Sequence, residues 1–378
     1  MIKKSLSFVL ILTVLLFTLT GCYDSTGIED FYYIVALGID KAENGLIRLS
    51  IQTAKTSSKS DSGSQQSSDY KIYSVNCESI DVGINILDNY LNKKINLSHC
   101  SAIIFSEEIA RENIKNYMTE LGNNIEIRPS CNLIISSKSA LDVLNKVSNS
   151  GEKFSARLYE YILNSVDYTG YTANSTISDF LARVNNNQIQ ATAIYSVVDD
   201  KTVQNSGIAV FKDNVMVGTL SPTETIAYLM IKNELNSCII SINNPFQDGG
   251  IINVELETLK QPNIDVDLIN HTPFISIKLD IQGDISSSGE KFDYVDDSNI
   301  EVVEVKVNQY MENLLREYLY KISKDFDSDI SNFNRILSAK FLTEDEFNKV
   351  HWNEIFKDSY FDVKVNTKIT STHLFNKE

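Results

Sequence analysis

The sequence predicts an α+β fold, with mixed sheets packed by helices, in a chain of more than one domain. Segments with the two-residue alternation of strands are interspersed with amphipathic helices along most of the 378 residues. Asn44-Gly45 separates two strand-like segments and predicts an opening hairpin, which excludes a purely parallel sheet. The hydrophobic content of 43% is typical of folded cores, and the length suits two or three domains.

The first half of the chain is predicted to alternate strands and helices. Ser79 and Ser106 are suited to N-caps, and the helix after Ser106 is expected to end just before Gly122. Seven of the fourteen residues at 56–69 are serines, so this segment is expected to be a flexible loop rather than a domain boundary. Strands are expected at 33–40, 46–55, 71–76, 102–105, 132–135 and 189–198, and further helices at 141–147, 154–166 and 177–184.

The second half contains two strong local signals. Asp213-Asn214 lies between strand-like segments and predicts a second hairpin. Ser-Pro-Thr-Glu at 221–224 is a complete helix start, with an N-cap serine, a proline in the first turn and a capping-box glutamate. Strands are expected at 237–242, 251–259, 265–269, 274–285 and 360–370, and helices at 298–326, 330–341 and after Thr343.

The first 22 residues indicate export and lipid attachment. Lys3 and Lys4 precede an apolar stretch at 6–19 that is too short for a comfortable transmembrane span. The stretch ends in Leu-Thr-Gly-Cys at 19–22, a bacterial lipobox, which predicts cleavage before Cys22 and lipidation of its sulfur. Two acyl chains such as palmitate, at roughly 0.8 kcal/mol per buried CH₂, make that anchor effectively permanent. We therefore expect an exported lipoprotein that is anchored to a membrane without spanning it.

An Asp-Asp-Lys sequence at 199–201 is interpreted as the join between two domains. The pattern of the region after it also allows a further division into two subdomains. The predicted organisation is a signal peptide at 1–21, an N-terminal domain at 22–200 and a C-terminal region at 201–378, with optional subdomains at 201–260 and 261–378.

Charge and cysteine usage restrict the classes of partner. The formal net charge of −16 argues against a nucleic-acid partner and against an electrostatic attraction to anionic lipid. Besides Cys22, the chain has four cysteines whose spacings match no zinc or redox pattern. Buried free thiols are the expected state, and an extracytoplasmic disulfide of unassigned pairing is the alternative. The four are Cys77, Cys100, Cys131 and Cys238.

The sequence contains none of the catalytic or cofactor motifs that we searched for. There is no G-x-S-x-G, no H-E-x-x-H and no phosphate-binding glycine loop. The four histidines are far apart, without the i, i+4 pairing of a metal site. Asp-Asp pairs at 199–200 and 296–297 could be calcium ligands, but turn and cap roles are favoured because no D-x-D-x-D-G loop surrounds them. We predict a non-enzymatic protein with no catalytic residues, cofactor or metal.

Several short sequence blocks occur in an order typical of one protein family. They include Gly-Cys-Tyr-Asp at 21–24, Val-Ala-Leu-Gly-Ile-Asp at 35–40, and the blocks at 97–110, 125–128, 140–144, 207–212, 352–356 and 361–365. Together they resemble the Ger(x)C family of spore germination proteins, the lipoprotein C subunits of nutrient germinant receptors. The resemblance covers nearly the whole chain. One departure is Tyr23, where the family usually has Trp.

The resemblance implies an elongated body of three mixed α/β domains on the outer face of the spore inner membrane. It implies two partners, an integral-membrane A-type subunit and a permease-like B-type subunit, and no catalytic residues. Leu-Ser-His at 97–99 could form a contact site, but a buried corner between a loop and a strand is the favoured interpretation. Gly38 and Gly207 are expected to be backbone requirements, and Trp352 is expected to be buried between the terminal helices and the last strand.

Two other classes of protein compete with this interpretation. A solute-binding lipoprotein of a transporter would need two lobes, a hinge and a ligand cleft, and the lack of paired βαβ repeats disfavours it. An enzyme acting on the cell wall would need catalytic residues, and the missing motifs disfavour that class. The leading hypothesis is therefore a receptor subunit needed for the germination response to nutrients.

Overall fold

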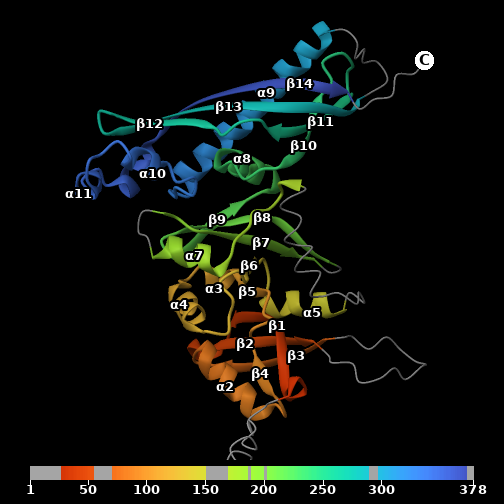
Figure 1. Cartoon of the computed structure of the whole chain (residues 1–378), viewed down its shortest axis with the longest axis vertical. Coiled ribbons are helices and arrows are strands. Elements are labelled where there is room, and N and C mark those ends of the chain that lie inside the picture. Colours follow the sequence, from red (N-terminus) through yellow and green to blue (C-terminus); the bar gives the residue numbers. More distant parts are fainter. Residues whose placement is uncertain are drawn as a thin grey trace, which may run out of the picture.

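The computed structural model of the chain describes residues 27–54, 70–149, 169–185, 189–199, 202–288 and 297–372. The predicted signal peptide, the lipidation site at Cys22, the serine-rich loop at 56–69 and the helix predicted at 154–166 lie outside these residues. The described residues form two sheets with their helices, stacked along the long axis of an elongated molecule (Figure 1). The predicted α+β class is confirmed.

The first sheet has nine strands and is mixed. They are β1 (Phe31–Lys41), β2 (Ile47–Ala54), β3 (Tyr70–Cys77), β4 (Lys94–Asn96), β5 (Ala102–Ser106), β6 (Asn132–Ser136), β7 (Thr192–Val198), β8 (Val203–Lys212) and β9 (Val215–Leu220). The main path runs β3-β2-β1-β5-β6-β7-β8-β9, and β4 pairs with the start of β1. Strands β1, β5, β6 and β7 are parallel, whereas the hairpins at both edges are antiparallel. The predicted opening hairpin is present, with positive φ at Asn44 and Gly45.

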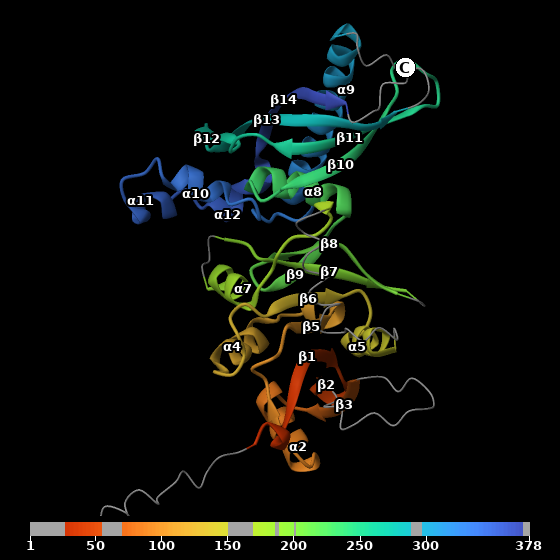
Figure 2. The same cartoon turned by 45° about the vertical axis from the view of Figure 1, so that its right-hand side comes forward.

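Helices cover both faces of the first sheet (Figure 2). One face carries α5 (Ala140–Asn149), whose Val143 and Leu144 pack on Ile104 and Ile134. The other face carries α2 (Ile80–Tyr90), α3 (Glu107–Ala110), α4 (Lys115–Asn123) and α7 (Ile177–Val184). Because both faces are covered, β5 and β6 are buried along their whole length.

The helix starts that the sequence predicts are confirmed at several positions. The Ser79 side chain caps α2 by accepting from the N–H of Val82. Ser221 and Glu224 form the predicted capping box of α8 (Pro222–Lys232), which has its proline in the first turn. These helix caps are formed by residues within one helical turn, so they do not depend on contacts with distant parts of the chain.

The single helix predicted between Ser106 and Gly122 is wrong, because α3 ends at Ala110 and α4 begins at Lys115. The break is held by a long-range contact, in which the N–H of Ile114 donates to the carbonyl of Asn214 in the β8–β9 turn at 3.2 Å. Gly122 lies inside α4, where a Cβ would be 2.4 Å from Leu181 of α7. This glycine therefore permits close helix packing instead of ending a helix.

The second sheet is built around the 17-residue strand β13. Its strands are β10 (Ser237–Asn243), β11 (Ile251–Thr258), β12 (Asn263–Ile269), β13 (Thr272–Ser288) and β14 (Tyr360–Thr372). The first part of β13 pairs with β12 and its later part with β11, both antiparallel, while β14 runs parallel along its other edge. The helices after β13 are α9 (Asp297–Tyr320), which continues through a π-helical turn at Lys321–Asp325, and then α10 (Phe333–Ser338), α11 (Glu344–Asn348) and α12 (Trp352–Ile355).

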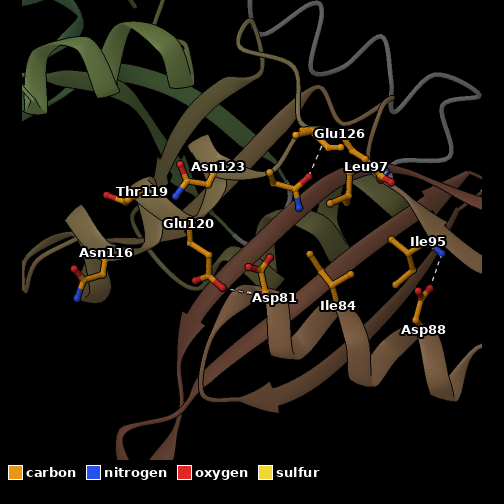
Figure 3. Close-up of a pocket in the computed structure, with 12 residues that line it drawn as sticks. Asp81, Ile84, Asp88, Ile95, Leu97, Asn116, Thr119, Glu120, Asn123 and Glu126 are labelled. Carbon is orange, nitrogen blue, oxygen red and sulfur yellow. Dashed lines mark hydrogen bonds between the residues drawn. The ribbon is translucent and has the colours of Figure 1, made fainter.

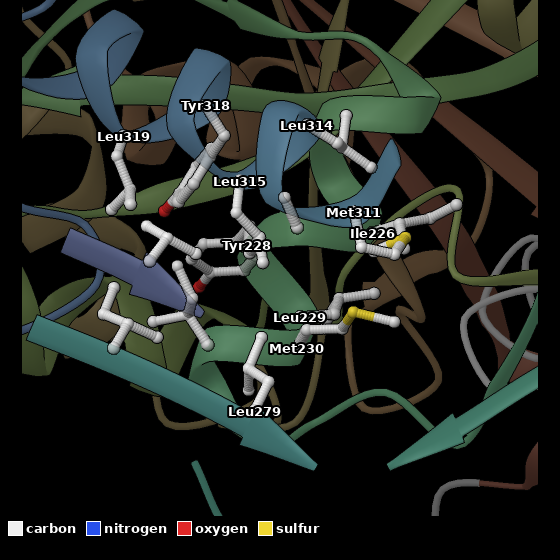
Figure 4. Packing of buried hydrophobic residues seen from close by; sticks show 14 of the residues in the cluster. Ile226, Tyr228, Leu229, Met230, Leu279, Met311, Leu314, Leu315, Tyr318 and Leu319 are labelled. Carbon is white, nitrogen blue, oxygen red and sulfur yellow. The ribbon is translucent and has the colours of Figure 1, made fainter. Parts of the chain in front are cut away.

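The core of the C-terminal half lies between α8, α9 and the second sheet (Figure 4). Tyr228 of α8 and Tyr318 of α9 meet at a ring-centroid distance of 6.4 Å, and both are buried. The Tyr318 hydroxyl is hydrogen-bonded to the Ser331 hydroxyl at 2.6 Å, so its polar end has a partner. Leu279 of β13 closes this core from the side of the sheet.

The predicted divisions of the chain do not coincide with the edges of the two sheets. Strands β8 and β9 follow the predicted join at 199–201, yet they are hydrogen-bonded into the first sheet, which extends to Leu220. The optional boundary at 260–261 falls in the turn between β11 and β12, inside the second sheet. The described residues therefore form two sheet-based units, where the resemblance implies three domains.

The β8–β9 hairpin joins the two units. Gly207 of β8 has φ +100°, and a Cβ there would lie 1.9 Å from the carbonyl oxygen of Leu220, so the expected backbone requirement is met. Gly218 of β9 leaves room for the ring of Phe326, which a Cβ would approach to 2.3 Å. The hydroxyl of Ser328 donates to the carbonyl of Phe211 at 2.7 Å. The segment after α9 is thereby fixed to the edge of the first sheet.

We expect Gly207→Ala to destabilise the protein far more than a glycine substitution at an open turn. Gly249 is the matched control, because it has φ +72° but no atom within 4 Å of a Cβ. Gly249→Ala should lower the free energy of unfolding by about 1–2 kcal/mol through backbone strain alone. Gly207→Ala adds a backbone collision and should cost more than about 4 kcal/mol. Urea unfolding of both variants measures the difference, and equal losses would contradict the close contact.

Candidate functional site

A polar groove opens beside α2, with a volume of about 700 Å³ (Figure 3). Helices α2 and α4 form two of its walls, and β4 with the segments around Leu97 and Asn124 closes it. The lining residues are Asp81, Ile84, Asp88, Ile95, Leu97, Asn116, Thr119, Glu120, Asn123, Asn124, Ile125 and Glu126. Of these residues, Leu97, Ile125 and Glu126 lie in sequence blocks that resemble the family, and the others lie outside those blocks.

The carboxylates of the groove accept hydrogen bonds from backbone N–H groups. Three such bonds are Asp81 N–H to Glu120 at 2.6 Å, Ile95 N–H to Asp88 at 2.7 Å and Leu97 N–H to Glu126 at 2.9 Å. Each bond joins two different segments, so these carboxylates hold the walls of the groove together. Burial and the neighbouring charge of Glu120 raise the pKa of Asp81.

The lining of the groove is negatively charged. It contains four carboxylates and no lysine or arginine, so its potential favours a cation or an amine over an anion. The lining residues include no histidine or cysteine, and hence no paired nucleophile and base. Among the residues that the structure describes, no group of three or more His, Cys, Asp or Glu side chains could hold a metal ion. The groove is therefore an acidic surface feature whose carboxylates also hold its walls together.

The Leu-Ser-His sequence at 97–99 is divided by the structure into buried and exposed parts. Leu97 is 2% exposed and belongs to the core of the first sheet. Ser98 hydrogen-bonds to the side chain of Asn96 through its N–H and its hydroxyl. His99 is exposed, with its ring edge-on to Tyr33 at 5.0 Å between centroids. The corner is thus a structural turn before β5, and His99 is its surface residue.

Asp40 links the sequence block at 35–40 to the block at 140–144, which begins α5. Its buried carboxylate accepts from the N–H groups of Ala140 at 2.5 Å and Leu141 at 3.0 Å, and so caps α5 from a strand 100 residues earlier. Gly38 leaves room for α5, because a Cβ there would lie 3.1 Å from the Cβ of Ala140. Burial raises the pKa of Asp40 even though both N–H groups oppose the shift. These residues have a structural role in docking α5.

A second buried carboxylate, Asp329, lies under the terminal helices. It is 2% exposed and accepts from the N–H groups of Phe333 at 3.1 Å and Asn334 at 2.8 Å. The indole N–H of Trp352 donates to it at 3.0 Å. Trp352 is 5% exposed, so its predicted burial is confirmed. Burial raises the pKa of Asp329 to about 6, against these hydrogen bonds, which favour the charged form.

The four cysteines after Cys22 are free and buried. The sulfur atoms of Cys100 and Cys131 lie 3.9 Å apart, at the entrances to the neighbouring strands β5 and β6. The contact with Cys100 and burial raise the pKa of the Cys131 thiol, and burial raises that of Cys238 to about 12. Such thiols are poor nucleophiles at neutral pH.

Within the described part of the chain, no helix is both long and apolar enough to cross a membrane.

Comparison with known proteins identifies the class. Residues 24–198 match the family described as spore germination protein N-terminal domain, and residues 206–373 match the one described as spore germination B3/GerAC like, C-terminal. Together the two matches span most of the chain. The chain therefore belongs to the GerAC-type, or Ger(x)C, family of spore germination proteins, as the sequence blocks predicted.

Curated relatives match over nearly the full length. Spore germination protein KC of Bacillus subtilis is 21% identical over 405 residues, covering 100% of this chain and 98% of the relative. Spore germination protein YndF of the same organism is 22% identical over 402 residues, covering 98% and 97%. The crystal structure of the GerBC protein superposes with a TM-score of 0.58 at 18% identity, covering 88% of this chain and 96% of that one. The fold is thus shared with GerBC.

The raised pKa of Asp329 predicts a pH dependence of stability. In the unfolded chain this carboxyl titrates near its ordinary value of 3.8, whereas in the folded protein it titrates at about 6. Between these values folding takes up a proton, so the free energy of unfolding should fall as pH rises from about 4 to 6 and level off above that. The two-unit difference corresponds to at most about 3 kcal/mol.

Asp329→Asn removes the titrating group and keeps an oxygen that can accept from Trp352. Urea unfolding measures the free energy of unfolding of the parent and the variant between pH 4 and 7. The difference between their pH profiles is the contribution of Asp329, because the contributions of Asp40 and the other carboxyls are common to both proteins. A parent and a variant with parallel pH profiles would contradict the raised pKa.

Proposed function

We propose that this protein is a non-enzymatic, lipid-anchored subunit of a spore nutrient germinant receptor. The observation that carries the proposal is the match to both family domains, together with curated spore germination relatives aligned from end to end. The lipobox at Cys22 supports attachment to the outer face of the spore inner membrane. The motif-poor sequence and a groove without a nucleophile support a binding or coupling role.

The partners that we propose are the integral-membrane A-type subunit and the permease-like B-type subunit of such a receptor. An anchored body with its own two-sheet fold can contact membrane partners through its surface while its lipid holds it at the bilayer. The membrane segments of the complex would then belong to the partners, and this chain would supply an external domain.

The solute-binding alternative needs two lobes that open and close about a hinge. In this chain, Ile208 and Val210 of the first sheet belong to the same apolar cluster as Ile226 of α8 and the strands of the second sheet. A continuous core across the junction resists hinge bending, because opening would expose that apolar surface to water. The geometry therefore favours a receptor subunit over a transporter's binding protein.

Deletion of the gene should slow or abolish germination triggered by particular nutrients, while germination by a non-nutrient stimulus continues. The reason is that a receptor subunit acts before the shared downstream steps. The loss of optical density of mutant and parent spores, followed with each stimulus, measures the effect. Equal defects with both stimuli would place the protein outside the nutrient receptor. The deletion is made in a strain with a single nutrient receptor, so that no second receptor can compensate. Unchanged nutrient germination in that strain would contradict the proposal.

Cys22→Ala should prevent lipidation and either release the protein from the spore membrane fraction or leave it stranded before maturation. Tyr23→Trp is the control, because it introduces the residue usual in the family and leaves the lipidated cysteine in place. Fractionation followed by immunoblotting measures the distribution between soluble and detergent-extracted material. A Cys22→Ala protein without its signal peptide that still requires detergent for extraction would show that a partner, and not the lipid, is the main attachment.

A further inference from the structure

Helix α2 carries an exposed apolar stripe. Val82, Ile86 and Tyr90 are four residues apart, so they lie along one face of the helix, and they are 41%, 40% and 82% exposed. The buried side of α2 is formed instead by Ile80, Gly83 and Leu87. The three exposed side chains, here called the α2 stripe, belong to neither the core cluster of the first sheet nor the lining of the groove.

The α2 stripe lies close to the point where the described chain begins. Strand β1 starts beside the end of α2, because Phe31 pairs with Lys94, four residues after Tyr90. The Tyr32 hydroxyl donates to Asn92 at 2.9 Å, which fixes this contact. Figures 1 and 2 both show α2 at the end of the molecule opposite to the second sheet.

The predicted lipid anchor is near this same end. Four residues, 23–26, separate Cys22 from Gly27, the first described residue. Even when fully extended, five residue steps span no more than about 18 Å. A lipid on Cys22 therefore holds the α2 end of the molecule against the bilayer, with the second sheet directed away from it.

We propose that the α2 stripe inserts into the interfacial region of the lipid bilayer and orients the anchored body. This inference rests on the proposed lipid anchor at Cys22. A tyrosine beside two aliphatic residues, followed by Lys93 and Lys94, has the composition of membrane-interface segments, in which aromatic rings and lysines lie at the headgroups.

The small area of the α2 stripe favours lipid over a protein partner, and the carboxylates of α2 lie away from the stripe. Asp81 and Asp88 of α2 line the groove and form hydrogen bonds there, so they lie on a different side of the helix from the α2 stripe. Glu29 and Asp30 at the chain start are exposed and would oppose a purely electrostatic contact with anionic lipid. Three side chains cannot form a protein interface of the usual size, about 800 Å² on each partner. They suffice for a membrane contact that a covalent lipid already holds in place.

The test places a tryptophan in the α2 stripe of the full-length lipidated protein. Ile86→Trp and a control, Leu342→Trp, are reconstituted in vesicles of phosphatidylcholine and phosphatidylglycerol with or without brominated acyl chains. Leu342 is 94% exposed and lies between α10 and α11, in the C-terminal half of the molecule. The native Trp352 is buried in both proteins and supplies the same background.

The brominated lipid should quench most of the added emission of Ile86→Trp and none of that of Leu342→Trp. Equal emission of Ile86→Trp in both kinds of vesicle, from protein that floats with the lipid, would overturn the proposal and leave the anchor intact. A third outcome would assign the α2 stripe to a protein contact. In that case brominated vesicles do not quench the Ile86→Trp emission, but the emission shifts when the receptor's membrane subunits are added. Protein that does not float at all would overturn the anchor and this inference with it.

A second variant separates insertion from folding. Replacing Val82, Ile86 and Tyr90 together by serine should lower the urea midpoint but leave the protein folded, because none of the three belongs to the core cluster of the first sheet. In this variant the amide hydrogens of α2 should exchange as fast on vesicles as in detergent. In the parent the amide hydrogens of α2 should exchange more slowly on vesicles than in detergent. Equal exchange of parent and variant on vesicles would contradict insertion.

Discussion

The fold depends on one strand that serves two cores. In β8, Ile208 and Val210 point into the cluster shared with α8, α9 and the second sheet, whereas Ala209 and Phe211 point into the core of the first sheet. This follows from the two-residue period of a strand whose faces are both covered. The close contact of Gly207 with Leu220 sets how the β8–β9 hairpin turns toward α8. Much of the contact between the two units is built on that hairpin, and Arg183 of α7 adds a hydrogen bond to Asn332 at 3.4 Å.

Features encoded by neighbouring residues could be predicted from the sequence. The Asn44-Gly45 turn, the Ser79 cap and the capping box at Ser221 need only a few residues to specify them, and they are found as expected. The α+β class followed from the order of such signals, and the family from the order of the sequence blocks that resemble it. The same sequence could not show where the first sheet ends. A strand that is buried on both faces, such as β8, has the same apolar pattern in the middle of one domain as at the junction of two domains.

Features that depend on distant partners were missed. The break between α3 and α4 is held by a bond from Ile114 to Asn214, 100 residues away, and the cap of α5 by Asp40 is equally remote. The groove is a further example, because its carboxylates come from segments separated by turns and helices and have no common spacing. Asp40 and Glu126 lay within sequence blocks that resemble the family, which marked them as important without showing what they contact.

The shared strand also has a mechanical consequence. A slip of β8 by one residue would exchange its two faces and move apolar side chains of both cores at once, so the strand has a single register. The apolar cluster shared across this strand therefore opposes bending between the two units. With the anchoring proposed above, a tilt of the α2 end at the bilayer would displace β13 and β14 sideways at the other end of the molecule (Figure 1). The length of the molecule would then amplify a small tilt at the bilayer into a larger displacement at the second sheet.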